Sequence, residues 1–171
     1  MIEPKIIKVG NVEAQPGEKN SGFLKVGEAP LSDINLPVGI INGTRPGPTL
    51  CVIAGEHAME YPGINAAIRI FKDTDPENLR GSLIIVPVVN TPAFETRTPY
   101  VCPIDNVNLA RAGSLSYRDG TISHIIKRTL IEKIVSISDY LINLHGGDYP
   151  ELLHPFTIVG FSGDEKVDAI S

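Results

Sequence analysis

Three apolar runs in this sequence lack the polar–apolar alternation of a half-exposed strand, and polar residues follow each one directly. The runs are residues 49–54, 82–89 and 139–144. A largely apolar run of this length is typical of a strand that is buried on both faces of a covered sheet. We also expect a strand over 35–41, which a Gly- and Pro-rich turn joins to 49–54 as a hairpin. Shorter strands are predicted over 5–9, 22–26 and 154–159.

Two stretches between these strands have helical periodicity. After Pro62, which suits the first turn of a helix, apolar residues recur at Ile64, Ala67, Ile68 and Phe71. A second helix is predicted over 121–136, again with one apolar face. The alternation of strand and helix predicts an α/β fold with a mixed, largely parallel sheet and flanking helices. We expect a single domain over residues 1–171.

Composition narrows the class of protein. The chain has 171 residues, of which 42% are hydrophobic and 20% charged, and its net charge is −5. An acidic balance argues against nucleic acid as a partner, and no apolar run is long enough to span a membrane. Two cysteines, Cys51 and Cys102, are too few for a disulfide framework, and no signal peptide is evident. We therefore expect a cytoplasmic protein, with self-association possible through an unfinished sheet edge.

Polar clusters follow the three buried strands. His57 and Glu60 come after the first, residues 90–97 after the second, and His145 after the third. Ligands of open α/β sheets collect where parallel strands end, so we expect these clusters to form one site. Two histidines and a carboxylate are the ligand set of many catalytic zinc sites. The alternative for His57 and Glu60 is a surface turn with a capping carboxylate, and for His145 a buried, hydrogen-bonded histidine.

The order of motifs along the chain resembles that of the succinylglutamate desuccinylase/aspartoacylase family, a branch of the zinc carboxypeptidase-like metallohydrolases. The similar segments are Gly55-Glu56-His57-Ala58-Met59-Glu60 with Gly63, Val86 to Phe94, Arg97, Pro103 to Arg111, and Leu144 to Asp148. The resemblance implies a carboxypeptidase-like fold and one zinc ion per chain, held by His57, Glu60 and His145. It further implies a hydrolase of the deacylase type that cleaves an amide or related acyl bond of a small carboxylate-bearing substrate, such as an N-acyl amino acid.

The same resemblance gives roles to polar residues of the long loop. Arg97 occupies the place of an arginine that binds substrate or stabilises the oxyanion, and Arg111 that of an arginine that binds a substrate carboxylate. A guanidinium group suits this role because it pairs with a carboxylate through two parallel hydrogen bonds. Asn108 can supply an amide nearby. Alternatively, both arginines are solvated loop charges and Asn108 caps the loop.

Three departures from the family pattern affect the predicted activity. Ala58 replaces the usual glycine of the first motif, which is a mild change. Ala110 replaces an asparagine beside Arg111, which removes one side-chain donor and makes the family's usual substrate selectivity a poor guide for this chain. No glutamate after His145 stands in the context of the family's general base. The sequence thus indicates either a piece of a longer enzyme or a C-terminally shortened homologue. The alternative function is a non-catalytic zinc-binding module that has lost this glutamate.

Overall fold

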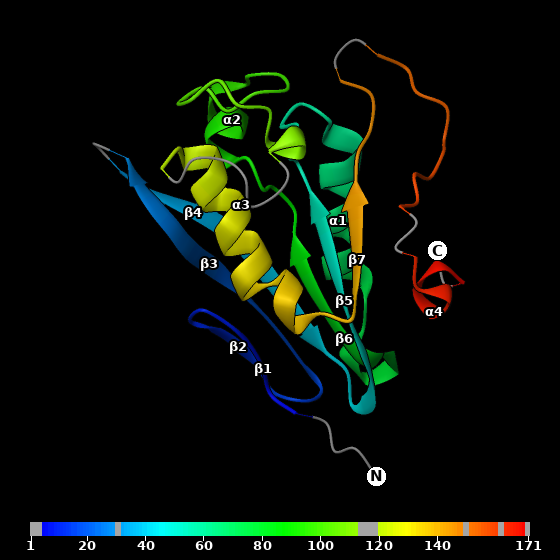
Figure 1. Ribbon diagram of the computed structural model, residues 1–171. Helices are drawn as coiled ribbons and strands as arrows, with labels where there is room; N and C mark the ends of the chain where they lie inside the picture. Colours follow the sequence, from blue (N-terminus) through cyan, green and yellow to red (C-terminus); the bar gives the residue numbers. More distant parts are fainter. Residues whose placement is uncertain (1–4, 30–31, 113–119, 149–150, 161–162, 170–171) are drawn as a thin grey trace.

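The computed structural model describes residues 5–29, 32–112, 120–148, 151–160 and 163–169 (Figure 1). Its strands are β1 (Ile7–Val9), β2 (Val12–Ala14), β3 (Glu18–Ala29), β4 (Ser32–Asn42), β5 (Arg45–Ala54), β6 (Arg80–Val86) and β7 (Tyr140–Leu144). Its α-helices are α1 (Tyr61–Asp73), α2 (Thr91–Thr96), α3 (Ile122–Lys133) and α4 (Glu165–Asp168). Short 3-10 turns are η1 (Pro76–Asn78), η2 (Leu109–Arg111) and η3 (Val135–Ile137).

The described strands form a five-stranded sheet of order β3-β4-β6-β5-β7 and a separate β1-β2 pair. Strands β6, β5 and β7 run parallel, whereas β3 and β4 join them in antiparallel pairing. The α/β fold predicted from the strand and helix pattern, with a mixed sheet and flanking helices, is therefore confirmed. Strands β5, β6 and β7 therefore end at one edge of the sheet, which is where the three polar clusters of the sequence begin.

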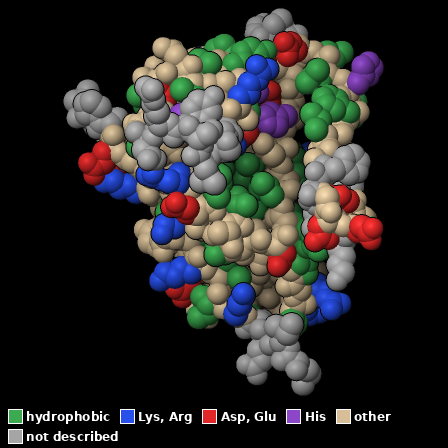
Figure 2. Space-filling model, viewed as in Figure 1, with side chains coloured by type: hydrophobic (Ala, Val, Ile, Leu, Met, Phe, Trp, Pro, Cys, Tyr) green, Lys and Arg blue, Asp and Glu red, His purple; other side chains and the backbone are tan. Residues whose placement is uncertain are grey.

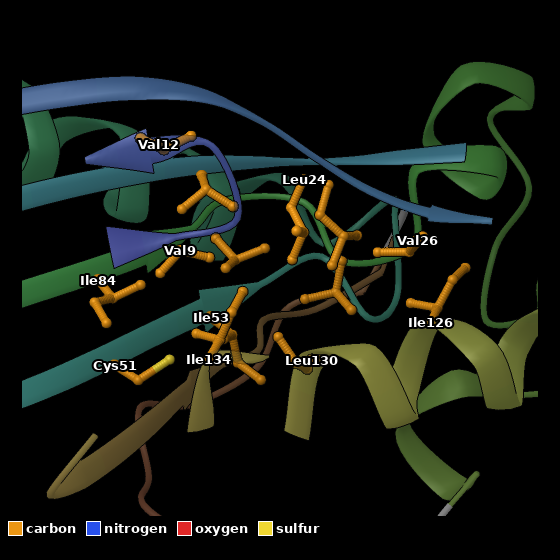
Figure 3. Close-up of a cluster of buried hydrophobic side chains, with 14 of the residues drawn as sticks. Val9, Val12, Leu24, Val26, Cys51, Ile53, Ile84, Ile126, Leu130 and Ile134 are labelled. Atoms are coloured by element: carbon orange, nitrogen blue, oxygen red, sulfur yellow. The ribbon is translucent and has the colours of Figure 1, made fainter. Parts of the chain in front are cut away.

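Helices cover the sheet on both faces (Figure 1). On one face, α3 and the β1-β2 pair pack over a core that includes Ile53, Ile126 and Leu130 (Figure 3). On the other face, α1 packs Ile64 and Ala67 over a second cluster. A fully buried Ile or Leu side chain contributes roughly 1.5–3 kcal/mol to folding. The two apolar faces of β5 therefore have two separate covers, which explains its uninterrupted apolar run.

The predicted hairpin between residues 35–41 and 49–54 is wrong. Strand β6 lies between β4 and β5, with Gly39 opposite Ile85 on one side and Val52 opposite Ile85 on the other. The insertion is fixed where β4 ends, since the Gly43 N–H donates to the Gly81 carbonyl at 2.9 Å. The apolar pattern predicted that these strands are buried but contained no information about which strand lies beside which.

Two further expectations differ from the structure. Residues 154–159, predicted as a strand, have no regular secondary structure and are mostly exposed. Strand β7 was expected to be fully buried, but Tyr140, Leu141 and Ile142 are each more than 40% exposed. Among the described strands β7 pairs with β5 alone, so its other edge is open. Self-association through this edge stays a prediction. No helix in the described part of the chain is long and apolar enough to cross a membrane.

Candidate metal site

Parallel strands β5 and β7 bring two histidines to the same edge of the sheet. Ala54 pairs with Leu144 at the ends of these strands, and each strand is followed by a loop that contains a histidine. Gly55 makes the turn after β5 with φ +66°, a conformation that other residues rarely adopt. His57 and His145 consequently face each other, with ring centroids 5.1 Å apart.

Helix α1 completes the site because its first turn packs directly on the end of β7. Gly63 makes this approach possible, since a Cβ atom there would lie 2.9 Å from the Leu144 carbonyl oxygen. Glu60 is the residue that precedes α1, and it makes no capping hydrogen bond with its side chain. Its carboxylate turns instead toward the histidines, contrary to the alternative of a capping carboxylate.

The Glu60 carboxylate lies between the two imidazoles. Its Oε1 is 2.8 Å from Nδ1 of His57, and its Oε2 is 2.9 Å from Nδ1 of His145. The Gly146 N–H also donates to Oε2 at 2.9 Å. The three side chains offer ligand atoms that all lie within 4.8 Å of one another. Two imidazoles and one carboxylate in this arrangement can hold a divalent metal ion with an open coordination position.

The electrostatics of the cluster favour bound positive charge. Burial alone would raise the pKa of Glu60, but hydrogen bonds from His145, His57 and Gly146 lower it to about 2. The carboxylates of Glu56 and Glu60 raise the pKa of His145 to about 9. Hydrogen bonding to Glu60 likewise raises the pKa of His57. Protons and a metal cation therefore compete for the same nitrogen atoms.

The Nε2 atoms of both histidines, on the far side of each ring from Glu60, have partners of their own. His57 Nε2 lies 3.1 Å from Oδ1 of Asn108, which also accepts from the Arg111 N–H at 3.3 Å. His145 Nε2 lies 3.6 Å from Oε2 of Glu56. Each imidazole is thus contacted on both nitrogens and presents Nδ1 to the centre of the site.

The remaining predicted residues differ in how directly they contact the cluster of His57, Glu60 and His145. Asn108 is in contact with His57, and Arg111 joins it through its backbone while its side chain is exposed. Arg97 ends α2 with φ +56°, and its exposed guanidinium makes no hydrogen bond or ion pair with any residue that the structure describes. Tyr100 lies edge-on to the His57 ring, at 5.4 Å between centroids, and donates to Glu151 at 3.0 Å. The roles of Asn108, Arg111 and Arg97 stay predictions, and the contact of Tyr100 with His57 was not predicted.

The site is open to solvent on one side. Histidine side chains reach the surface on the face of the molecule drawn in Figure 2. The His145 side chain is 37% exposed and that of His57 15%, whereas Glu60 is 7% exposed. A small molecule can therefore reach the two imidazoles while the carboxylate between them stays shielded.

Comparison with known proteins agrees with this geometry. The catalytic domain of the succinylglutamate desuccinylase/aspartoacylase family matches residues 46–147, which hold all three candidate ligands. The chain belongs to this family. A curated relative, an N-alpha-acetyl-L-2,4-diaminobutyric acid deacetylase from Halomonas elongata, is 32% identical over 139 residues, which are 79% of this chain and 40% of that protein.

Solved structures of family members share the fold. A succinylglutamate desuccinylase from Silicibacter sp. TM1040 superposes with a TM-score of 0.69 at 28% identity, over 83% of this chain and 45% of that one. The product-bound ectoine utilization protein EutE (DoeB) from Ruegeria pomeroyi gives 0.66 at 26%, over 84% and 43%. The resemblance seen in the sequence motifs is confirmed. The chain spans less than half the length of these relatives.

The sequence motifs assigned no role to Glu56, Lys127 and Asn143, which meet on the Nε2 side of His145. The buried carboxylate of Glu56 binds Lys127 of α3 in an ion pair and accepts from Nδ2 of Asn143 at 2.7 Å. One signal was available, because Asn143 lies two positions before His145 in the chain. Nothing in the sequence indicated Lys127, which the fold brings to Glu56 from 71 residues away.

Proposed function

We propose that this chain carries the metal site of a zinc-dependent deacylase that hydrolyses the amide of a small N-acyl amino acid. The observation that supports the proposal best is the placement of Glu60, whose two oxygens face Nδ1 of His57 and Nδ1 of His145. Family membership supports a hydrolase of this class, and the Halomonas relative is a deacetylase of an N-acetylated amino acid. We place the protein in the cytoplasm, with the buried cysteines Cys51 and Cys102 as free thiols.

The residues around the site divide the work of binding and catalysis. His57, Glu60 and His145 would hold one zinc ion, which when bound polarises a carbonyl and lowers the pKa of water. The exposed guanidinium of Arg97 is available to stabilise negative charge that develops on the carbonyl oxygen. Arg111 binds the substrate carboxylate, a contact that suits its planar fork of donors. Asn108 would donate to substrate through its Nδ2 group, because its Oδ1 is occupied by His57.

The second candidate is zinc binding without turnover. In the part of the chain that the structure describes, the two carboxylates seen to contact His57 and His145 are already engaged, Glu60 by the two Nδ1 atoms and Glu56 by Lys127 and Asn143. Neither is therefore available to take a proton from water. This observation favours a module that binds metal but needs a further carboxylate for hydrolysis.

Zinc content per chain tests the proposal directly, with His145→Ala as the variant and His154→Ala as the matched control. His154 is an exposed histidine outside the cluster. We expect about one zinc in the parent and in the control, and a clear loss in His145→Ala, since the variant has only two of the three ligands. Equal zinc in all three proteins would exclude the site.

Hydrolysis separates the two candidate functions. The parent chain is incubated with a panel of N-acetyl amino acids, with and without a chelator, and free amine is measured. Release of amine that chelation abolishes supports the deacylase. Stoichiometric zinc without turnover supports the non-catalytic module instead.

A further inference from the structure

The Glu56 carboxylate is an unusual group to find beneath this site. It is 1% exposed, and an ionised carboxylate at such depth is stable only with partners. Lys127 binds Oε1, and Asn143 donates to Oε2 at 2.7 Å. These partners come from α3 and β7, so Glu56 is held from two elements besides its own loop. The position of its carboxylate is consequently fixed by the fold.

The fixed carboxylate faces the Nε2 atom of His145. Glu56 Oε2 and His145 Nε2 are 3.6 Å apart, an ion-pair separation slightly longer than a hydrogen bond. The other ring nitrogen, Nδ1, lies 2.9 Å from Glu60. The imidazole of His145 therefore lies between two carboxylates, one at the centre of the site and one behind it.

His57 has a similar pair of contacts, with an oxygen atom facing each nitrogen of its ring. Its Nδ1 also faces Glu60, at 2.8 Å, and its Nε2 faces the amide oxygen of Asn108, at 3.1 Å. Both histidines thus point the same nitrogen inward and have an oxygen acceptor on the other. The acceptor is neutral for His57 and charged for His145, so the two rings differ in the basicity that their partners impose.

Glu56 cannot itself be a ligand beside Glu60, because the imidazole of His145 separates the two carboxylates. Its oxygens are also occupied by Lys127 and Asn143, which leaves it unsuited to accept a proton from substrate water. Orientation of the ring is the remaining function that its contacts support.

We propose that Glu56, clamped by Lys127 and Asn143, is the positioning residue of His145: it binds the Nε2 edge of the imidazole and presents Nδ1 to the metal. This inference rests on the zinc site proposed above. A carboxylate in this position fixes the tautomer of a metal-binding histidine and strengthens it as a ligand. Zinc affinity should therefore depend on a residue that never touches the ion.

The test is the zinc dissociation constant of Glu56→Gln, measured by competition with a chromophoric chelator. We expect binding weaker than in the parent by roughly 10- to 100-fold, the usual cost of losing such a partner. Ser82→Ala is the control, because it removes a buried hydrogen bond to Asn42 at the other end of the sheet. That variant should bind zinc like the parent, which separates loss of positioning from loss of stability.

Proton exchange measured by NMR gives a second test of the position of the His145 ring. In the zinc-loaded parent, the Nε2-bound proton of His145 should exchange slowly with water in ¹⁵N NMR spectra, and Glu56→Gln should speed this exchange. Parent-like affinity together with parent-like exchange in the variant would overturn the inference. If Glu56→Gln does not fold, the double variant Glu56→Gln/Lys127→Met is used with the same readings, since it leaves no unpaired charge.

Failure of the zinc site itself is distinguishable from failure of this inference. If the parent binds no zinc, the proposed function is wrong. The orientation of His145 is then decided on the metal-free chain: slow exchange of the Nε2 proton in the parent and faster exchange in Glu56→Gln support positioning. Equal exchange in both proteins rejects it.

Discussion

Gly63 is the point at which the stability of the fold and the geometry of the metal site depend on the same contact. In Gly63→Ala, the added Cβ would lie 2.9 Å from the Leu144 carbonyl oxygen and 3.2 Å from its carbonyl carbon. Both atoms belong to the backbone of β7 immediately before His145. The clash can therefore be relieved only if α1 moves away from the strand.

Two effects of opposite sign determine the magnitude. Alanine in place of glycine favours a helix by at most about 1 kcal/mol. Forcing an extra carbon into a packed contact costs about 1–3 kcal/mol. We expect the steric term to dominate, with a net loss of about 1–2 kcal/mol in the free energy of unfolding. For a chain of this size, that loss lowers the melting temperature by about 2–8 °C.

The assay is urea denaturation of the metal-free chain, with Asn65→Ala as the matched control. Asn65 is exposed on the same helix, so its replacement adds helix propensity without a clash. We expect the control to be as stable as the parent or slightly more stable. Movement of α1 also displaces Glu60 from His145, so Gly63→Ala should bind zinc more weakly than the control. A Gly63→Ala chain as stable as the parent would refute the reasoning.

Two more predictions concern charge. In the metal-free chain the pKa of His145 is raised to about 9, so the stability from its contacts with Glu56 and Glu60 is complete below about pH 6.5 and is lost as pH rises toward 9; urea midpoints across this range should fall in the parent and change less in His145→Ala. Asp105 accepts from the N–H and the hydroxyl of buried Ser123, each at 2.8 Å, at the start of α3. Asp105→Ala should cost about 1–3 kcal/mol in urea denaturation, because it leaves those donors unsatisfied, whereas Asp105→Asn should lose less.

The pattern of the sequence predicted the elements well where other elements of the described chain cover their apolar side chains. Helix α3 and the strands β5 and β6 follow from apolar positions alone, because each element presents its apolar side chains to a core. The pattern failed for β7, whose run is also largely apolar but which lies at an open edge of the described sheet. The apolar side chains of a strand predict that it can be buried. Whether it is buried depends on which other elements pack against it.

The family motifs also predicted the three candidate ligands. These residues lie together because each follows a parallel strand that ends at the same edge of the sheet. The structure brings His57, Glu60 and His145 within reach of one ion. The long loop is a different case, since no periodicity defines it: Asn108 contacts His57, while the guanidinium of Arg97 extends into solvent.

By itself, then, the sequence determined the α/β class and the family, and it predicted three residues as metal ligands, because these inferences depend on local pattern and on ordered motifs. Only the tertiary structure decided that β6 separates β4 from β5 and that Lys127 reaches Glu56 beneath His145. Both are contacts between residues far apart in the chain. Such contacts arise from the packing of whole elements, and local residue patterns do not specify them.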